Sequence, residues 1–337
     1  MGAGRPTNEP GNYFALGKQS AKDTEATTFT FLRHLDGTAM EVQEEVQRER
    51  EGGDGQEVGL IYKTSIDMDG QAVFNSRPEV SARVWAWTLG ADSVGAPAGI
   101  GSTASGVANE HTAVPTSTVP YLTAEQFWAD QVERSPNVQI TELELAWEQG
   151  RPFKVTPKFI GGGSPYSPTA AQSPTRETGP PFYYPLASVV LDGAANTLIT
   201  KGRITIKRGV DDGIRTIGLN REDVVALNFD TDAELTVKYD NATASLYDKT
   251  HFGGAGGSQI PFDLATTSLS IYQALGAGTN ARYMQIGLNA LNLIGARANK
   301  LDPEGKTMYA DLSFAGYKSA THQVFAKHLV ASVAALT

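Results

Sequence analysis

The sequence predicts a mainly β protein with two tandem units, each a β-sandwich or barrel-like sheet flanked by a short α-helix and carrying long extended loops. Three observations predict this class. Apolar side chains alternate along many short segments, Asp-Gly pairs recur between them as turn signals, and the same order of hairpins and one helix repeats in each half. The length agrees, because 337 residues suffice for about two domains.

The boundaries of the units follow from composition. Residues 163–181 are rich in Gly, Pro, Ser and Thr, which is typical of a linker loop. This linker separates a first unit at 26–162 from a second unit at 182–317. We expect an N-terminal arm at 1–25 and a separate C-terminal segment at 318–337.

The clearest hairpin and helix signals lie in the first half. Residues 143–147 and 153–159 alternate on either side of a turn, which predicts a hairpin. Residues 78–90 predict a helix, because Pro78 suits its first turn and Gly90 suits its C-cap.

Two other segments of the first half are expected to be turns and loops. The pair Asp69-Gly70 predicts a tight turn between strands at 58–66 and 71–74. Residues 91–120 have almost no periodicity and predict a long loop. A loop of that length is uncommon inside a domain unless it has a function.

The second half shows a similar order of elements. Residues 267–276 predict a helix, and 283–293 with 307–314 predict a hairpin. Apolar residues four apart within 325–333 fit a helix, and a β-strand is the alternative there. The shared order favours a diverged internal duplication.

Charge argues against a nucleic-acid-binding protein. The formal net charge is −9, and residues 1–150 alone hold 22 acidic and 10 basic side chains. Affinity for phosphates comes largely from the release of their counterions by Lys and Arg. A chain without a basic stripe is therefore a poor candidate for gripping DNA, although DNA can pass along it without specific binding.

A search for catalytic chemistry finds no candidate. The chain has no Cys, its five His residues stand at no metal-ligand spacing, and neither a G-x-S-x-G elbow nor a phosphate-binding Walker loop occurs. No run of 18 apolar residues predicts a membrane span. We expect no catalytic residues, no cofactor, no metal site and no membrane partner, and hence a protein that is not an enzyme.

Several segments, taken in order, resemble the tail tube proteins of long-tailed, in particular non-contractile, double-stranded DNA bacteriophages. The resemblance covers most of the chain and is weaker after the linker. It rests on Arg77-Pro78, Leu89-Gly90, His111-Thr112, Pro120-Tyr121-Leu122-Thr123 and the segment 140–162 that ends in Ile160-Gly161-Gly162.

This resemblance implies a structural virion protein that forms closed rings, which stack head to tail into the hollow tail tube through which the genome passes. It implies a location in the virion tail after synthesis in the host bacterial cytoplasm, and contacts with tape-measure and tail terminator or tip proteins. Family members with one unit form six-fold rings. Two units in one chain therefore favour a trimer with pseudo-six-fold symmetry, and a hexamer is the alternative.

Contacts between subunits are expected from the loops and the arm, because such segments often order only on assembly. The candidate residues are Gly95, Pro97, Ile100, Val107, His111, Val114 and Pro115 in the long loop, Tyr166 and Pro168 in the linker, and Tyr13 and Phe14 in the arm.

Two other functions remain open. A capsid or decoration protein is also acidic and rich in loops, but the long helical spine usual in capsid chains is missing from the sequence pattern. A carbohydrate-binding β-sandwich needs exposed aromatic side chains in a groove, whereas the pattern places Trp85, Trp87, Trp128 and Trp147 in the core.

Overall fold

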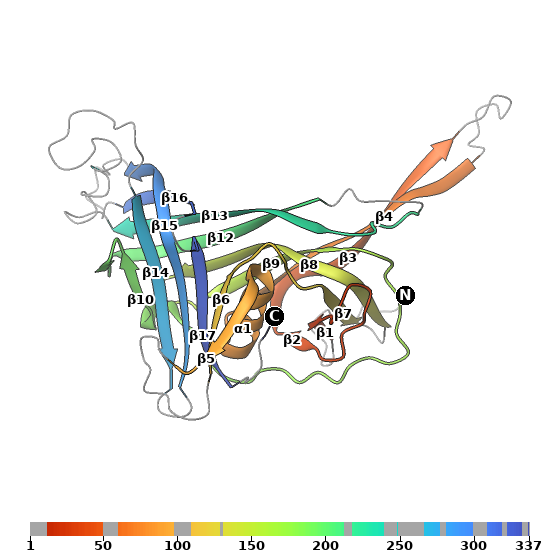
Figure 1. Cartoon of the computed structure of the whole chain (residues 1–337), viewed down its shortest axis with the longest axis horizontal. Coiled ribbons are helices and arrows are strands. Elements are labelled where there is room, and N and C mark those ends of the chain that lie inside the picture. The colour runs from red at the N-terminus through yellow and green to blue at the C-terminus, as the bar shows by residue number, and fades with distance from the viewer. Residues whose placement is uncertain are drawn as a thin grey trace, which may run out of the picture.

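The structure is a computed structural model in which strands predominate (Figure 1). It describes residues 12–49, 60–97, 109–128, 131–211, 218–238, 248, 266–276, 281–298, 309–318, 322–331 and 336. Seventeen strands within these ranges form one connected antiparallel network. The first half contributes β1 (Tyr13–Lys18), β2 (Thr30–Leu32), β3 (His34–Glu49), β4 (Leu60–Asn75), α1 (Pro78–Leu89), β5 (Gly90–Gly95), β6 (Asn109–Pro115), β7 (Leu122–Trp128), β8 (Gln131–Glu148) and β9 (Lys154–Gly161).

The second half begins with a short 3-10 helix, η1 (Tyr184–Leu186), and continues with strands. These are β10 (Ser188–Leu191), β11 (Ala194–Ala195), β12 (Ile199–Asp211), β13 (Val225–Lys238), β14 (Thr266–Leu275), β15 (Arg282–Ala298), β16 (Tyr309–Gly316) and β17 (Val324–Val330).

The predicted helix at 78–90 is confirmed as α1. Pro78 occupies its first turn, and Gly90 ends it in the left-handed region at φ 99°, where its N–H bonds to the carbonyl of Ala86. One face carries Val84 and Trp85, both fully buried. The helix contacts β6, β8 and β17, so it covers the core between the two halves.

Eight strands form a long sheet in the order β3-β4-β9-β8-β12-β13-β16-β15. One face of this sheet is apolar and packs against a second layer that contains α1, β6, β14 and β17, with which it forms one core cluster. The strands β8 and β15 are long enough to belong to both layers, because their N-terminal parts pair with β7 and β14.

The four strands of the first half repeat the pairing of the four strands of the second half. A row of directly opposite residues runs across each set. The row of the first half is Ile140, Phe159, Gly70 and Met40, and the row of the second half is Leu293, Phe314, Ala233 and Ile204. We call residues at equal positions in such rows counterparts.

The irregularities of the ladders repeat as well. A register shift lies at the same place in three pairs of ladders. Because β-bulges are specific features of a strand pair, their recurrence supports a repeat. The shifts fall at His34/Asp36 and Ile199/Lys201, at Leu122/Ala124 and Thr267/Leu269, and at Ile140/Glu142 and Leu293/Gly295.

Two ladders join the halves, namely β8 with β12 and β6 with β17. The main core cluster draws on both halves. The boundaries expected at 26–162 and 182–317 stay a prediction, because the halves share a sheet and a core.

The helix expected at 267–276 is wrong, since this segment is the strand β14. Leu269, Ile271 and Gln273 are buried while their neighbours are not, which is the two-residue period of a strand. The described residues therefore show a flanking helix for the first half only.

The hairpin expected around Asp69-Gly70 is also wrong, because β4 runs straight through this pair and pairs with β3. Gly70 serves close approach rather than a turn. A Cβ atom at this position would lie 1.5 Å from the carbonyl oxygen of Ala39, so only glycine lets the two strands pass at the β3 bulge.

Three expected loops or tails contain strands. The long loop 91–120 contains most of β5 and all of β6, the arm 1–25 contains β1, and the C-terminal segment contains β17. The strand alternative for 325–333 is therefore confirmed as far as Val330. The hairpins expected at 143–159 and 283–314 are confirmed as β8–β9 and β15–β16.

Buried histidines face each other where β17 meets β6. His328 stands directly opposite His111, whose Nδ1 lies 2.8 Å from Oδ2 of Asp92. Burial, with a smaller contribution from His111, lowers the pKa of His328 to about 3. His328 therefore stays neutral in the folded chain at pH values where an exposed imidazole takes up a proton.

We predict that mild acid destabilises this ladder. The unfolded chain protonates His328 below about pH 6.5 and the folded chain does so only near pH 3, so this contribution is complete above pH 6.5. As the pH falls below 6.5, this contribution to stability declines, and the folding equilibrium constant decreases by up to roughly tenfold per pH unit. Urea midpoints measured between pH 7.5 and pH 4.5 should shift less in His328→Leu than in the wild type. His322→Gln, at an exposed position, is the control, and equal pH responses in wild type and His328→Leu would contradict the prediction.

Candidate functional site

The second face of the long sheet is polar and is covered by no described element. Along β8, β9, β12, β13 and β16 the apolar side chains point to the core, and the residues between them point to the other side. On these five strands the acidic side chains of this face include Glu142, Glu144, Glu148, Asp230, Asp232, Glu234 and Asp311, and the basic ones include Lys154, Lys158, Lys201, Arg203, Lys207 and Lys238. Toward β3 and β4 the same face also carries Glu41, Asp67 and Asp69. We call this surface the polar face.

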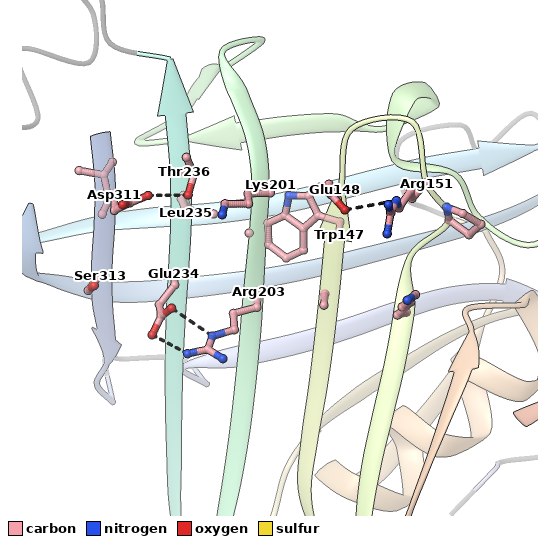
Figure 2. Close-up of a pocket in the computed structure, with 15 residues that line it drawn as sticks. Trp147, Glu148, Arg151, Lys201, Arg203, Glu234, Leu235, Thr236, Asp311 and Ser313 are labelled. Carbon is pink, nitrogen blue, oxygen red and sulfur yellow. Dashed lines mark hydrogen bonds and ion pairs between the residues drawn. The ribbon is translucent and has the colours of Figure 1, made fainter. Parts of the chain in front are cut away.

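Charges on the polar face pair across neighbouring strands. Arg203 donates to both carboxylate oxygens of Glu234, at 3.1 and 2.9 Å, and lies 3.7 Å from Glu144 (Figure 2). The bonds to Glu234 raise the pKa of the Arg203 guanidinium. Similar pairs join Lys158 to Glu142 at 2.8 Å and Lys207 to Asp232 at 3.5 Å. Most charges on this part of the face therefore have a partner of opposite sign.

An open groove of about 660 Å³ lies on the polar face over β8, β12, β13 and β16. Figure 2 shows its lining residues spread across neighbouring antiparallel strands of the sheet rather than gathered at one point. Among the described residues, no group of three or more His, Asp or Glu side chains is placed to hold a metal ion. The groove has the character of an exposed sheet surface.

The ladder between β8 and β12 is the seam of the two halves. On its core side, Leu143 stands opposite Ile206 and Leu145 opposite Ile204. Trp147 stands opposite Gly202, and a Cβ atom on Gly202 would lie 2.5 Å from Cζ2 of Trp147. The glycine thus makes the space that the buried indole occupies.

The long sheet ends in two strands, β3 and β15, at opposite sides of the molecule (Figure 1). β3 pairs with β4 on one side only. The pairing of β15 with β14 stops at Asn292, beyond which β16 is its described partner strand. These two strands are the counterparts of β12 and β8, the strands at the seam.

The side chain of Gln126 covers part of the β3 edge. The N–H of Met40 donates to its Oε1 at 3.2 Å, and its Nε2 donates to the Met40 carbonyl at 2.8 Å. A glutamine amide therefore satisfies both backbone groups that point away from β4. Gln126 itself is 9% exposed.

The linker is bound to the first half. Glu177 accepts hydrogen bonds from the N–H groups of Glu79 and Val80, at 3.2 and 3.1 Å, and so caps the N-terminus of α1. Burial raises the pKa of the Glu177 carboxyl. Tyr166 exchanges backbone hydrogen bonds with Arg134. The linker is therefore a packed surface segment over much of its length.

The predicted contact residues are scattered. Tyr13, Phe14 and His111 are buried in strands, so this chain leaves them little surface for a neighbour. Gly95 is exposed at the end of β5, Pro97 follows that strand and is half-buried, and Val114 and Pro115 are half-buried in β6. Ile100 and Val107 lie outside the described residues.

Tyr166 and Pro168 are brought together with Phe127 and Trp128 at a surface groove of about 680 Å³. Trp128 is 38% exposed, so its expected place in the core is wrong, whereas Trp85, Trp87 and Trp147 are buried as expected. Sequence patterns missed Gln126 and the seam residues, because their roles depend on strands far apart in the chain.

Replacing Gly202 by Ala tests the seam. The added methyl group meets Trp147 and, at 2.8 Å, the carbonyl oxygen of Glu234. We expect a loss of about 1–3 kcal/mol in the free energy of unfolding, measured by urea denaturation. The control is Gly295→Ala in β15, where the nearest atom is Cβ of Ser313 at 3.9 Å and we expect a change within about 0.5 kcal/mol. Equal effects of the two substitutions would contradict this account of the seam.

Comparison with known families agrees with these features. The family model of the phage tail tube protein matches residues 11–316, which is most of the chain. A search of curated proteins finds no match. No helix among the described residues is long and apolar enough to cross a bilayer. The family match favours a tail protein over a capsid, decoration or carbohydrate-binding protein. The chain belongs to the phage tail tube protein family and is a structural component of the virion tail.

Proposed function

We propose that copies of this chain join edge to edge through the long sheet into a closed ring, and that rings stack into the tube through which double-stranded DNA leaves the virion. The observation that carries the proposal is the repeat within the long sheet. Its two halves have the same strand pairing and share three register shifts, and its end strands are the counterparts of the strands joined at the seam. A further copy of the chain can therefore add to the β3 end or to the β15 end of the sheet through the same kind of ladder as the seam.

The shape of the molecule favours the polar face as the channel wall. The second layer and α1 lie on the apolar side of the long sheet. A closed ring offers more room outside than inside, so the bulky side is better accommodated on the outside. The thin polar side then turns toward the axis.

Paired charges suit a wall that DNA must pass. Free Lys and Arg side chains would hold phosphates through counterion release, but Arg203, Lys158 and Lys207 each have a carboxylate neighbour. Over β8, β9, β12, β13 and β16 the face is close to balanced in charge, and Glu41, Asp67 and Asp69 make it more acidic toward β3 and β4.

We expect DNA to pass without specific binding, and predict that purified tubes bind linear DNA no more tightly at 50 mM than at 200 mM salt.

Two repeats in one chain favour three chains in a ring with pseudo-six-fold symmetry, and six chains are the alternative. The match to the tail tube family supports self-assembly and contacts with tape-measure and terminator or tip proteins. We extend this to a long, non-contractile tail, as in the phages whose tube proteins the sequence resembles. Gly95, Pro97, Tyr166 and Pro168 remain our candidates for contacts between rings.

Electron microscopy of the purified protein across a concentration series tests the proposal. We expect rings or stacked tubes with a central channel, because head-to-tail contacts join different surfaces and propagate. Native mass spectrometry of single rings should give a mass of three chains. A ring of six chains would contradict the trimer but keep the tube, whereas a monomer at every concentration would contradict both.

A further inference from the structure

We infer that β3 of one chain pairs with β15 of a second copy, in the register of the seam, and that Gln126 is the cap this pairing displaces. The inference rests on the proposed ring and adds the partner strands, their register and the group that must move. Residues 40–43 of one chain and 295–298 of the next form the ladder.

The register follows from the rows of directly opposite residues within the chain. Met40 and Ile204 are counterparts, because each stands opposite a residue that itself stands opposite a phenylalanine, Phe159 or Phe314. A second pair of rows, which starts on β8 in the first half and on β15 in the second, identifies the counterparts on these two strands. It runs through Leu145, Val155, Phe74 and His34 in the first half and through Ala298, Ala310, Val237 and Ile199 in the second.

Leu145 and Ala298 are therefore counterparts on β8 and β15. Ile204 stands directly opposite Leu145 at the seam. The same geometry between two chains places Met40 opposite Ala298. Continuing in the antiparallel direction, it places Glu41 opposite Arg297, Val42 opposite Ala296 and Gln43 opposite Gly295.

The β3 edge shows that its backbone groups point toward a missing strand. Met40 directs its N–H and carbonyl away from β4, where the Gln126 amide binds both. Its counterpart Ile204 faces β8 at the same position. Gln126 thus supplies Met40 with the hydrogen-bond partners that strand β8 supplies to Ile204. Without such a cap, the edge strand could pair with other chains in any register.

The capping residue belongs to the first half only. Gln126 stands opposite Phe14, and at the equal position of the second half Ile271 stands opposite Val189. Ile271 is fully buried and apolar. The polar side chain therefore occurs in the half whose edge strand lacks a neighbour, and the apolar one occurs where β8 covers the edge.

Assembly exchanges partners at the β3 edge. Gln126 leaves Met40 when β15 arrives, and backbone groups of the neighbouring strand take the place of its amide. Exchange keeps the backbone groups satisfied before and after pairing. The free chain is thus protected against pairing in a wrong register.

Cysteine pairs test the register directly, because the chain has no Cys of its own. Opposite residues in a non-hydrogen-bonded pair lie about 4.5 Å apart at Cα, within the range of a disulfide. Glu41 and Arg297 form such a pair in the inferred ladder. Glu41→Cys with Arg297→Cys, assembled under reduction and then oxidised, should give covalent chains of two and three subunits on a non-reducing gel.

The matched control is Glu45→Cys with Arg297→Cys. Glu45 lies four residues further along β3, roughly 13 Å away, and should not link. Gln43→Cys with Gly295→Cys is a second predicted pair that keeps both charges, in case the first variant does not assemble. Tubes that link only through the control pair, or through neither predicted pair, would overturn the ladder and leave the proposed tube intact. Absence of any ring in the wild type would overturn both.

The cap is tested by Gln126→Ile, which introduces the residue type that Ile271 has at the equal position of the second half. Loss of the two bonds to Met40 should lower the protein concentration at which rings appear about tenfold, as light scattering would show. Gln139→Ile, at a buried glutamine on β8, is the control and should leave the threshold unchanged. A threshold that stays the same or rises in Gln126→Ile, with an unchanged circular dichroism spectrum, would overturn the role of Gln126.

Discussion

The need of every strand edge for hydrogen-bond partners governs this structure. A buried N–H or carbonyl without a partner costs as much as a lost hydrogen bond, so a sheet must close, be covered or be paired. Within the chain, the β8–β12 ladder meets this need by joining the two halves in one long sheet. At the ends of that sheet the same need remains, and at Met40 the Gln126 amide meets it.

The seam also joins the two halves in one sheet and one main core cluster. Its core side contains Leu143, Leu145 and Trp147, and these side chains pack in one cluster with residues of both halves. Separating the halves would expose this apolar surface together with a row of backbone groups. The linker adds to the cohesion, since Glu177 caps α1. An internal repeat therefore coexists with a single core.

Local signals predicted the local elements. The helix α1 and the β8–β9 hairpin were predictable because Pro78, Gly90 and strict alternation act within a few residues. The segment at β14 was assigned to the wrong class because its apolar residues fit both periods, and only pairing with β10 and β15 decides between them. Gly70 was taken for a turn because its true function, room for the Ala39 carbonyl, depends on a distant strand.

The site was less predictable than the fold for the same reason. The sequence favours loops as contact surfaces, whereas the contacts that we propose between chains use strand edges and a sheet face. Arg203 and Glu234 are 31 residues apart, and Gln126 is 86 residues from Met40, so no local pattern connects them. The order of elements in the two halves of the sequence does indicate the repeat. The ladders then show that the polar Gln126 and the apolar Ile271 occupy equal positions in the two halves. Once the ladders identify the counterparts, the seam inside the chain becomes a template for the contact between chains.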